Sequence, residues 1–341
     1  MLLATKRQGS AIILCLSIAL ACSAQVLARD HKPFYVSFQV PNSTGSYPTC
    51  INNHLTVAGY FTGGSGLYHG FVRDIFGRIE TFNVGSVVTE PVSINDRGET
   101  AGTYEDVSGV ERGFVRSSKG VISTFNPGGD NGFTVVRGMN EDGMVVGSYT
   151  TSNSSPTFGF LRYPDGGIVT FNAPQDASGT FPWGLNNRGA TTGISSIGDN
   201  PPGGFVRSLD GDTTTFNYGL GISPLSINDR GEIAGWYYIP GYYLGFVRSV
   251  TGKITPFDLP DQAEIGTQSI SINAAGDVTG SYQVDENSAV HGFIRFRNGK
   301  LITFDPPGAT FTDPTGIADS GAVTGRYYSN SANPTGFLRI P

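Results

Sequence analysis

The sequence is poor in cysteine, histidine and the short motifs of catalysis. Only three of its 341 residues are cysteine, and two of them, Cys15 and Cys22, lie near the N-terminus, so Cys50 has no internal disulfide partner further along the chain. The four histidines are scattered, without a His-Glu-x-x-His or Cys/His cluster, so no metal site is predicted. Neither a Gly-x-Ser-x-Gly elbow nor a phosphate-binding loop occurs. The common signatures of zinc, serine-nucleophile and nucleotide chemistry are therefore missing.

Basic charge is also scarce. The chain has 22 Lys and Arg against 28 Asp and Glu, a formal net charge of −6, and no basic stripe. This balance argues against a nucleic-acid partner, whose phosphates require clustered positive charge. With only two tryptophans, the repeated Trp docking motifs of a quinone-dependent dehydrogenase cannot be present, and no cofactor is predicted.

Long hydrophobic runs are absent except for one near the N-terminus. Lys6 and Arg7 precede an apolar run from Ala11 to Leu20, which is followed by small residues up to Ala24. This order is typical of a secretory signal peptide, and the run is short for a membrane span. We expect residues 1–24 to be removed, with cleavage as late as residue 28 as an alternative, and a secreted or periplasmic protein. Lipid attachment at Cys22 is a weaker alternative, because the large aliphatic residue lies one place too late.

What the sequence does contain is one string, Gly-Phe-aliphatic-Arg, repeated seven times. Successive copies are 41 to 47 residues apart. The copies begin at Gly70, Gly113, Gly159, Gly204, Gly245, Gly292 and Gly336. A period of this length is that of one four-stranded propeller blade. One arginine per repeat at a fixed strand position is interpreted as a structural element rather than as an anion site.

Each repeat has the pattern of four short strands and no sustained helical periodicity. Runs rich in Val, Ile, Thr, Phe and Tyr are bounded by Gly, Asn and Asp, as in Ile94-Asn95-Asp96-Arg97-Gly98, which predicts a tight hairpin turn. The first repeat has Leu55 where this glycine would be, so we expect a different turn or strain there. A further glycine inside the second strand, such as Gly102, indicates close approach of a neighbouring ring or backbone, and the recurring Phe of strands three and four are the expected occupants.

The two ends of the chain complement each other. The last repeat stops at Pro341, two residues after Arg339, and therefore lacks a fourth strand. The stretch Phe34–Pro41 matches a fourth strand such as Ile302–Pro307. We therefore predict an all-β, seven-bladed β-propeller over residues 34–341, with four-stranded blades and a ring closed by pairing of the N-terminal strand into the last blade. A single monomeric domain is expected.

The full repeat, Ile-Asn-Asp-x-Gly-x-x-x-Gly-x-Tyr followed by Gly-Phe-Val-Arg and Thr-Phe-Asn, resembles the HAF-type "probable extracellular repeat" proteins of bacteria. The resemblance covers residues 34–341 and implies export and a propeller-like β fold. It carries no catalytic residues that can be transferred to this chain.

The sequence is compatible with two kinds of function, a binding module and an enzyme. The variable loops gather on one face, where propellers usually bind ligands. The candidate ligand-binding residues there are Phe133, Trp183, Tyr218, Tyr242 and Tyr243. Aromatic side chains beside acids suit a glycan or protein ligand, and an exported, non-catalytic binding or scaffold module is the first hypothesis. The alternative is a polysaccharide hydrolase or lyase that uses loop-face carboxylates. The acids considered are Asp130, Asp176, Asp261, Glu264, Asp285, Glu286 and Asp313.

Overall fold

The structure, a computed structural model, describes residues 32–341 except 86, 153–155, 175–178, 197–200, 260–265, 286–287 and 331–332. The chain divides into two units, Met1–Lys32 and Pro33–Pro341, and the fold concerns the second. The predicted signal peptide and Cys22 lie outside the described residues. Within the described part, the chain forms 28 strands and no helix, so no helix is present that could cross a membrane.

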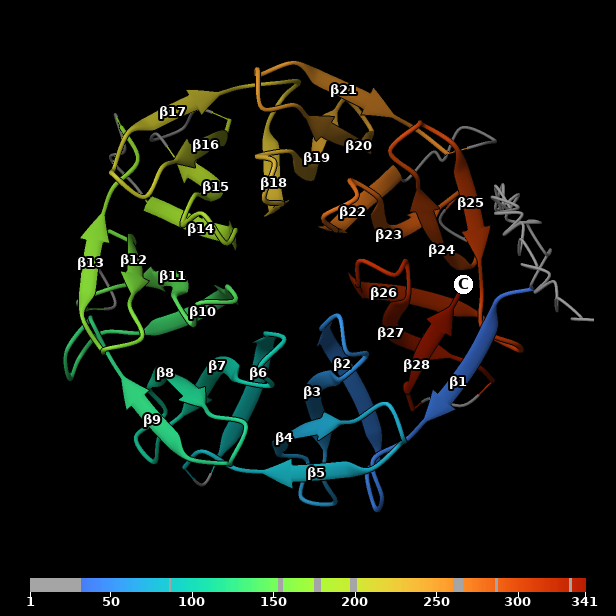
Figure 1. The fold of residues 1–341 in the computed structure, drawn as a ribbon, viewed down its shortest axis with the longest axis horizontal. Helices are drawn as coiled ribbons and strands as arrows, with labels where there is room; N and C mark the ends of the chain where they lie inside the picture. The colour runs from blue at the N-terminus through green and yellow to red at the C-terminus, as the bar shows by residue number, and fades with distance from the viewer. Residues whose placement is uncertain are drawn as a thin grey trace, which may run out of the picture. The chain divides into compact units, whose positions relative to one another are not determined.

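The strands occur in sets of four that share one order from the middle of the unit outward (Figure 1). The innermost strands are β2 (Gly45–Ile51), β6 (Val88–Ile94), β10 (Thr134–Met139), β14 (Gly179–Leu185), β18 (Ile222–Ile227), β22 (Gly266–Ile272) and β26 (Phe311–Ile317). The second strands are β3 (Val57–Thr62), β7 (Thr100–Glu105), β11 (Val145–Tyr149), β15 (Thr191–Ser196), β19 (Ile233–Ile239), β23 (Val278–Gln283) and β27 (Val323–Tyr328).

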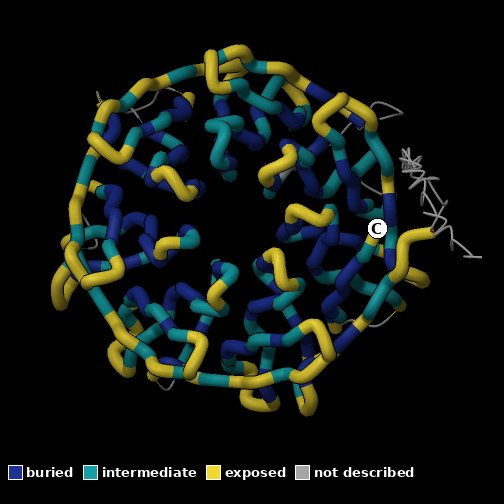
Figure 2. The backbone as a smooth tube through the Cα atoms, viewed as in Figure 1, coloured by how far each residue is buried: buried dark blue, intermediate teal, exposed yellow. Residues whose placement is uncertain are grey.

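The third strands carry the Gly-Phe-aliphatic-Arg string. They are β4 (Tyr68–Arg73), β8 (Glu111–Arg116), β12 (Phe158–Arg162), β16 (Gly203–Arg207), β20 (Tyr242–Arg248), β24 (Val290–Arg295) and β28 (Thr335–Ile340). The outermost strands are β5 (Ile79–Phe82), β9 (Ile122–Phe125), β13 (Ile168–Phe171), β17 (Thr213–Phe216), β21 (Ile254–Phe257), β25 (Leu301–Phe304) and, from the other end of the chain, β1 (Phe34–Phe38). Residues of the inner three strands are mostly buried or intermediate, whereas exposed residues are found at the turns and along the outermost strands (Figure 2).

The strands pair into five sheets rather than into separate four-stranded sheets throughout. Four sheets have four strands each, and the fifth has 12, comprising β18 to β28 together with β1. The larger sheet arises because two parallel bridges of a single residue pair, Tyr243 with Gly266 and Val290 with Phe311, connect neighbouring sets. Within each set, all pairings are antiparallel.

The first strand pairs with the last, as the chain ends suggested. β1 runs antiparallel to β28, with Phe34 opposite Ile340 and Phe38 opposite Gly336. The last set also contacts the first: the Thr315 hydroxyl donates to the carbonyl of Pro48 at 3.1 Å, and the amide of Asp319 donates to Asn53 Oδ1 at 2.9 Å.

The hydrophobic core lies between neighbouring sets of strands. It is built from the repeated Phe rings, on which the repeated Arg side chains stack. The Phe of each third strand is fully buried, as Phe71 and Phe114 illustrate, and each burial is worth about 1.5–3 kcal/mol. Phe82 of the preceding set meets Phe114 edge to face, with 6.0 Å between ring centroids. The guanidinium of Arg116 lies 4.8 Å above the same Phe82 ring, and this stacking recurs for all seven arginines at 4.5–5.2 Å. The arginines are thus structural: each stacks on the preceding set, and most also donate to the carbonyl of the following residue, as Arg73 does to Asp74 at 3.1 Å.

Two kinds of glycine make this packing possible, and the expectation for the second-strand glycine is correct for backbone and for the strand-three Phe but wrong for the strand-four Phe. A Cβ at Gly102, inside the second strand, would clash with the backbone carbonyl oxygen of Glu90 on the innermost strand. Backbone, with the strand-three Phe114 behind it, therefore occupies that space. The strand-four ring Phe125 instead covers Gly113 of the Gly-Phe-aliphatic-Arg string, and it leaves no room for a Cβ there.

The turn between the first two strands is the same in the first repeat as elsewhere. The amide of Leu55 donates to the Asn52 carbonyl, as the amide of Gly98 does to the Asn95 carbonyl. Leu55 therefore takes the left-handed conformation, with φ of 59°. Of the two expectations for this turn, strain is correct and a different turn is wrong, because the hydrogen bonds of Asn52 fix the backbone.

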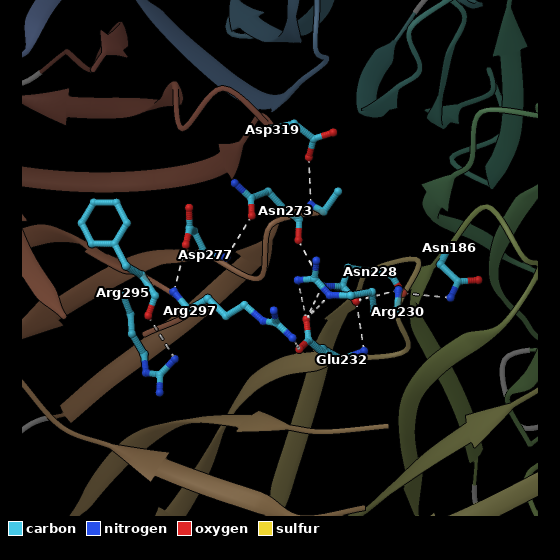
Figure 3. A network of polar contacts seen from close by, with 11 residues as sticks. Asn186, Asn228, Arg230, Glu232, Asn273, Asp277, Arg295, Arg297 and Asp319 are labelled. Atoms are coloured by element: carbon cyan, nitrogen blue, oxygen red, sulfur yellow. Dashed lines mark hydrogen bonds and ion pairs between the residues drawn. The ribbon is translucent and has the colours of Figure 1, made fainter. Parts of the chain in front are cut away.

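The turn asparagines also join one set to the next. Each accepts backbone N–H groups of its own turn through Oδ1 and donates through Nδ2 to the corresponding carbonyl of the following set, for example Asn140 to Asn186 at 3.1 Å. Figure 3 shows two further links, Asn186 to Asn228 and Asn228 to Asn273. The series runs from Asn52 to Ala318, whose methyl side chain cannot continue it. Sequence reasoning found the turn role of these residues and missed the link.

Candidate functional site

The innermost strands enclose two hollows that meet at a belt of apolar side chains. The turns after the innermost and third strands lie on one side, which we call the turn face, and the other connections lie on the opposite side, the loop face. A hollow of about 200 Å³ opens to the turn face, and one of about 420 Å³ lies towards the loop face. Side chains shared by both hollows form the belt between them: Ile51, Ile94, Met139, Leu185 and Ile317.

The turn-face hollow is rimmed by the residues that follow the turn asparagines. Each backbone N–H donates to the side-chain oxygen of its counterpart in the next set, as from Asn53 to Asp96 at 2.7 Å and from Asp96 to Glu141 at 2.8 Å. Ala274, which has no side-chain acceptor, interrupts this rim. The side-chain oxygens around this hollow therefore accept hydrogen bonds that hold neighbouring sets together. We assign them a structural role.

The loop-face hollow is lined by one bulge residue from each innermost strand. The register shifts between Val136 and Gly138 of β10 and between Pro182 and Gly184 of β14, which leaves Arg137 and Trp183 without a partner on the second strand. A β-bulge of this kind re-aims a side chain, and here it directs both into the hollow. The bulge residues around the wall are Thr49, Val92, Arg137, Trp183, Leu225, Ile270 and Thr315. Only Arg137 among them is charged, and only Trp183 is aromatic.

These two exceptional residues are neighbours. The guanidinium carbon of Arg137 lies 3.9 Å from the centroid of the Trp183 ring. Arg137 is partly buried, and among the described residues its guanidinium forms no side-chain hydrogen bond or ion pair; its nitrogens are not among the buried unpaired atoms either, so they face the solvent of the hollow. A guanidinium has five N–H donors, and here they remain available to a ligand. Arg137 thus presents an unused set of donors beside an aromatic ring.

Two glutamates complete the charge pattern around Arg137. Burial lowers the pKa of Arg137, while the nearby charges of Glu111 and Glu90 oppose that shift. Burial, reinforced by the charge of Glu111, raises the pKa of Glu90, and Arg137 opposes it. Burial likewise raises the pKa of Glu111, although the residue is exposed. Glu90 and Glu111 therefore act on Arg137 by their charge, but neither lines the hollow, in which Arg137 is the charged side chain among the described residues.

The five aromatic residues predicted as ligand contacts lie at separate places. Trp183 lines the loop-face hollow. Phe133 lines a different hollow of about 540 Å³ together with Asp130. Tyr218, which is exposed, borders a third hollow of about 350 Å³ and packs on Tyr237. The remaining two lie in β20, where Tyr243 packs on Trp236 at 4.9 Å and follows Tyr242 directly.

The predicted carboxylates do not converge among the described residues either. Asp176, Asp261, Glu264 and Glu286 lie outside the described residues. Asp130 is beside Phe133, and Asp313 forms an ion pair with Arg326 at 2.9 Å. Sequence reasoning missed Glu90, Glu111 and Arg137. Arg137 could have been found from its position in the repeat. At the corresponding bulge position of the innermost strand, the other repeats carry uncharged residues.

Metal ligands do not cluster in the part of the chain that the structure describes. No group of three or more His, Cys, Asp or Glu side chains there has an arrangement suited to a metal ion. The Cys50 thiol borders the loop-face hollow, but burial raises its pKa to about 12 despite a hydrogen bond from Thr49, so it is a poor nucleophile.

The fold is similar to that of solved propeller proteins, whereas no family model and no curated protein sequence matches the chain. Virginiamycin B lyase from Staphylococcus aureus is 15% identical with a TM-score of 0.61, over 91% of this chain and 100% of that one. The β-propeller domain of the trilobed protease from Pyrococcus furiosus is 13% identical with a TM-score of 0.61, over 87% and 94%. Puromycin hydrolase is 13% identical with a TM-score of 0.60, over 86% of this chain and 52% of that one. At these identities the likeness shows a β-propeller fold and nothing about activity.

Proposed function

We propose that residues 34–341 form a seven-bladed propeller closed by β1, with β18–β21, β22–β25 and β26–β28 plus β1 as three of the blades. The single-pair bridges within the 12-stranded sheet support this division, because each is much smaller than the pairings inside a set. The contacts of Thr315 with Pro48 and of Asp319 with Asn53 support closure. We further propose that the chain is exported through residues 1–24 and is related to the HAF-type extracellular repeat proteins, as its N-terminus and repeat suggest.

The function we propose is non-catalytic binding of a carbohydrate in the loop-face hollow. Arg137, stacked on Trp183 and without an acceptor in the described chain, carries this proposal. A sugar presents oxygen acceptors, which match the donors of Arg137, and its apolar face suits an aromatic ring such as Trp183. The hollow, about 420 Å³ and concave, falls in the range of small-ligand sites, whereas a protein partner usually requires a broader surface.

A binding screen with matched variants tests this function. The purified chain is applied to a glycan array, and hits are measured by calorimetry with the wild type, Arg137→Ala and Trp183→Ala. We expect each variant to weaken binding at least about tenfold, the equivalent of about 1.4 kcal/mol. Arg97→Ala is the control, because Arg97 lies exposed on the turn face with Glu99 as its ion-pair partner. Equal affinities for all four proteins would rule out this site.

A second candidate function, glycoside cleavage, is favoured by one observation. Glu90 and Glu111 interact electrostatically, and burial raises the pKa of both, as is required of a carboxyl group that donates a proton near neutral pH. Product analysis of oligosaccharides incubated with the wild type, Glu90→Gln and Glu111→Gln separates the two functions. Cleavage by the wild type that both substitutions abolish would establish the enzyme, and intact oligosaccharides with retained binding would establish the binding module.

A further inference from the structure

A stack of three tyrosines lies on the loop face next to the candidate site. Tyr47 of β2 and Tyr60 of β3 are directly opposite each other in the sheet, and their rings are parallel within 10° with centroids 4.8 Å apart. Tyr68, at the start of β4, follows at 5.0 Å from Tyr60. We call Tyr47, Tyr60 and Tyr68 the tyrosine stack.

The tyrosine stack lies outside the hydrophobic clusters that the described residues form in the core. Its outer residue, Tyr68, is 36% exposed. The inner end of the stack is fixed by Arg326, whose guanidinium carbon lies 5.4 Å from the Tyr47 centroid and which Asp313 holds in an ion pair. The rings of Tyr47 and Tyr60 cover each other, so the open aromatic surface of the row is that of Tyr68, and an aromatic ring held in place at the surface is typical of a preformed binding platform.

The tyrosine stack begins beside the loop-face hollow, because Tyr47 precedes Thr49 by two residues on β2 and Thr49 lines that hollow. Tyr60 lies close enough to Glu90 for the glutamate charge to act on its phenol. Glu90 in turn interacts with Arg137, and Arg137 lies on Trp183. The charges of Arg137 and Glu90 therefore lie between Trp183 in the hollow and the tyrosine stack, whose outer residue, Tyr68, is exposed.

The side chains from Trp183 to Tyr68 combine aromatic rings with polar groups, as a carbohydrate site requires. Burial and the charge of Glu90 raise the pKa of Tyr60 to about 12, with Arg326 opposing, so its phenol keeps its proton throughout the physiological range. These side chains thus offer ring surfaces together with hydroxyl, guanidinium and carboxylate groups. A single sugar unit would contact only part of them.

We propose that the ligand is an oligosaccharide chain of several units, one end of which occupies the loop-face hollow while the following units lie over the tyrosine stack. This inference rests on the proposed carbohydrate-binding function and adds the length of the ligand and a second contact surface. Tyr68 is the outermost contact, so its contribution grows only when the ligand is long enough to reach it.

The test is calorimetry with ladders of β-1,4-linked glucose, β-1,4-linked N-acetylglucosamine and α-1,4-linked glucose, from one to six units. For a ladder that binds, we expect affinity to increase with length up to about four units and then to level off. Tyr68→Ala should lower the affinity for the long members about two- to tenfold and leave the shortest bound member unchanged. Phe76→Ala is the matched control, because Phe76 is an aromatic residue of the same set that is 93% exposed on the turn face.

Each outcome distinguishes this inference from the function beneath it. Affinity that is independent of length, or an equal loss at all lengths in Tyr68→Ala, would overturn the extended site and leave binding in the hollow intact. Length-dependent binding that Arg137→Ala abolishes and Tyr68→Ala reduces would support both. Absence of binding to all three ladders by the wild type would overturn the carbohydrate function and the extended site together.

Discussion

Arg137 and Trp183 occupy the same bulge position in neighbouring innermost strands, and the guanidinium of one lies 3.9 Å above the ring of the other. The seven arginines of the repeated string also stack on aromatic rings, but they do so between sheets, where their rings are Phe and their neighbours are buried. The same interaction thus serves two purposes in this chain, and stability measurements can separate them.

Substitution by methionine should lower the free energy of unfolding more at an arginine of the repeated string than at Arg137. Arg116 is buried, stacks on Phe82 and pairs with Glu80, so Arg116→Met should lower the free energy of unfolding by about 1–3 kcal/mol. Arg137→Met keeps the apolar stem and removes a charge that has no acceptor in the described chain, so the change should be below about 1 kcal/mol. Urea unfolding of the two variants measures the difference. A similar large loss in both would mean that Arg137 is structural.

The pairing of β1 with β28 should be essential to stability. The Phe38 ring is buried, meets Phe71 at 6.1 Å and lies beneath Arg73, so Phe38→Ala should cost about 3–5 kcal/mol. Phe34→Ala in the same strand is the control, because Phe34 is 62% exposed and should change stability by at most about 0.5 kcal/mol. Thermal melts of both variants measure this. Equal melting temperatures for the two would show that the first strand does not hold the last in solution.

Leu55 should prefer glycine to alanine, the reverse of the usual order. Its φ of 59° costs a residue with a Cβ about 1–2 kcal/mol, and Leu55→Ala keeps that cost while losing apolar contacts. Leu55→Gly loses the same contacts and relieves the strain, so it should be more stable than Leu55→Ala by about 1 kcal/mol. At the neighbouring His54, whose φ is not positive, the alanine variant should be the more stable. Chemical unfolding of the four variants measures the order, and the prediction fails if alanine is preferred at both positions.

Glu90 and Glu99 should give pH dependences of opposite sign. Burial and Glu111 raise the pKa of Glu90 above its ordinary value of 4.5, so its contribution to stability is greatest below pH 4.5 and is lost as pH rises through the folded-state pKa. At Glu99 burial alone would raise the pKa, but hydrogen bonds from Asn95 and Arg97 and the charge of Arg97 lower it, so its contribution is lost as pH falls.

Urea unfolding at several pH values between about 4 and 8 measures both effects. Glu90→Gln should gain stability relative to the wild type towards the upper end of this range, and Glu99→Gln should lose stability there. A Glu90→Gln variant whose difference from the wild type is the same at every pH would contradict the argument.

The strands could be predicted from the sequence because each repeat contains the same residues that favour strands and turns. Gly-Phe-aliphatic-Arg fixes a strand, Asn-Asp-x-Gly fixes a turn, and the spacing between copies sets the size of each set. The roles of single residues were harder, since they depend on neighbours in the next repeat. Nothing in the string around Asn140 reveals that its side chain donates to Asn186 in the following set.

The candidate site was less accessible still. Trp183 was recognised as an aromatic residue but was placed in a loop, whereas it lies at the bulge of β14; Arg137 looks like an ordinary polar residue in a strand. Its direction is set by a one-residue shift of register between Val136 and Gly138, and such a shift cannot be read from alternation alone. Glu90 and Glu111 come from two strands of the set before it, so only the packing of one set on the next brings the three charges together.

Because β1 pairs with β28, this pairing can form only after both strands have been synthesised. The backbone groups of β1 bond to water until β28 has been synthesised, because the strand that accepts them lies at the far end of the sequence. A product that ends before Thr335 lacks this partner, so its sheet keeps an unpaired edge. Truncation within β28 would therefore expose the edges of two strands that lie far apart in the sequence.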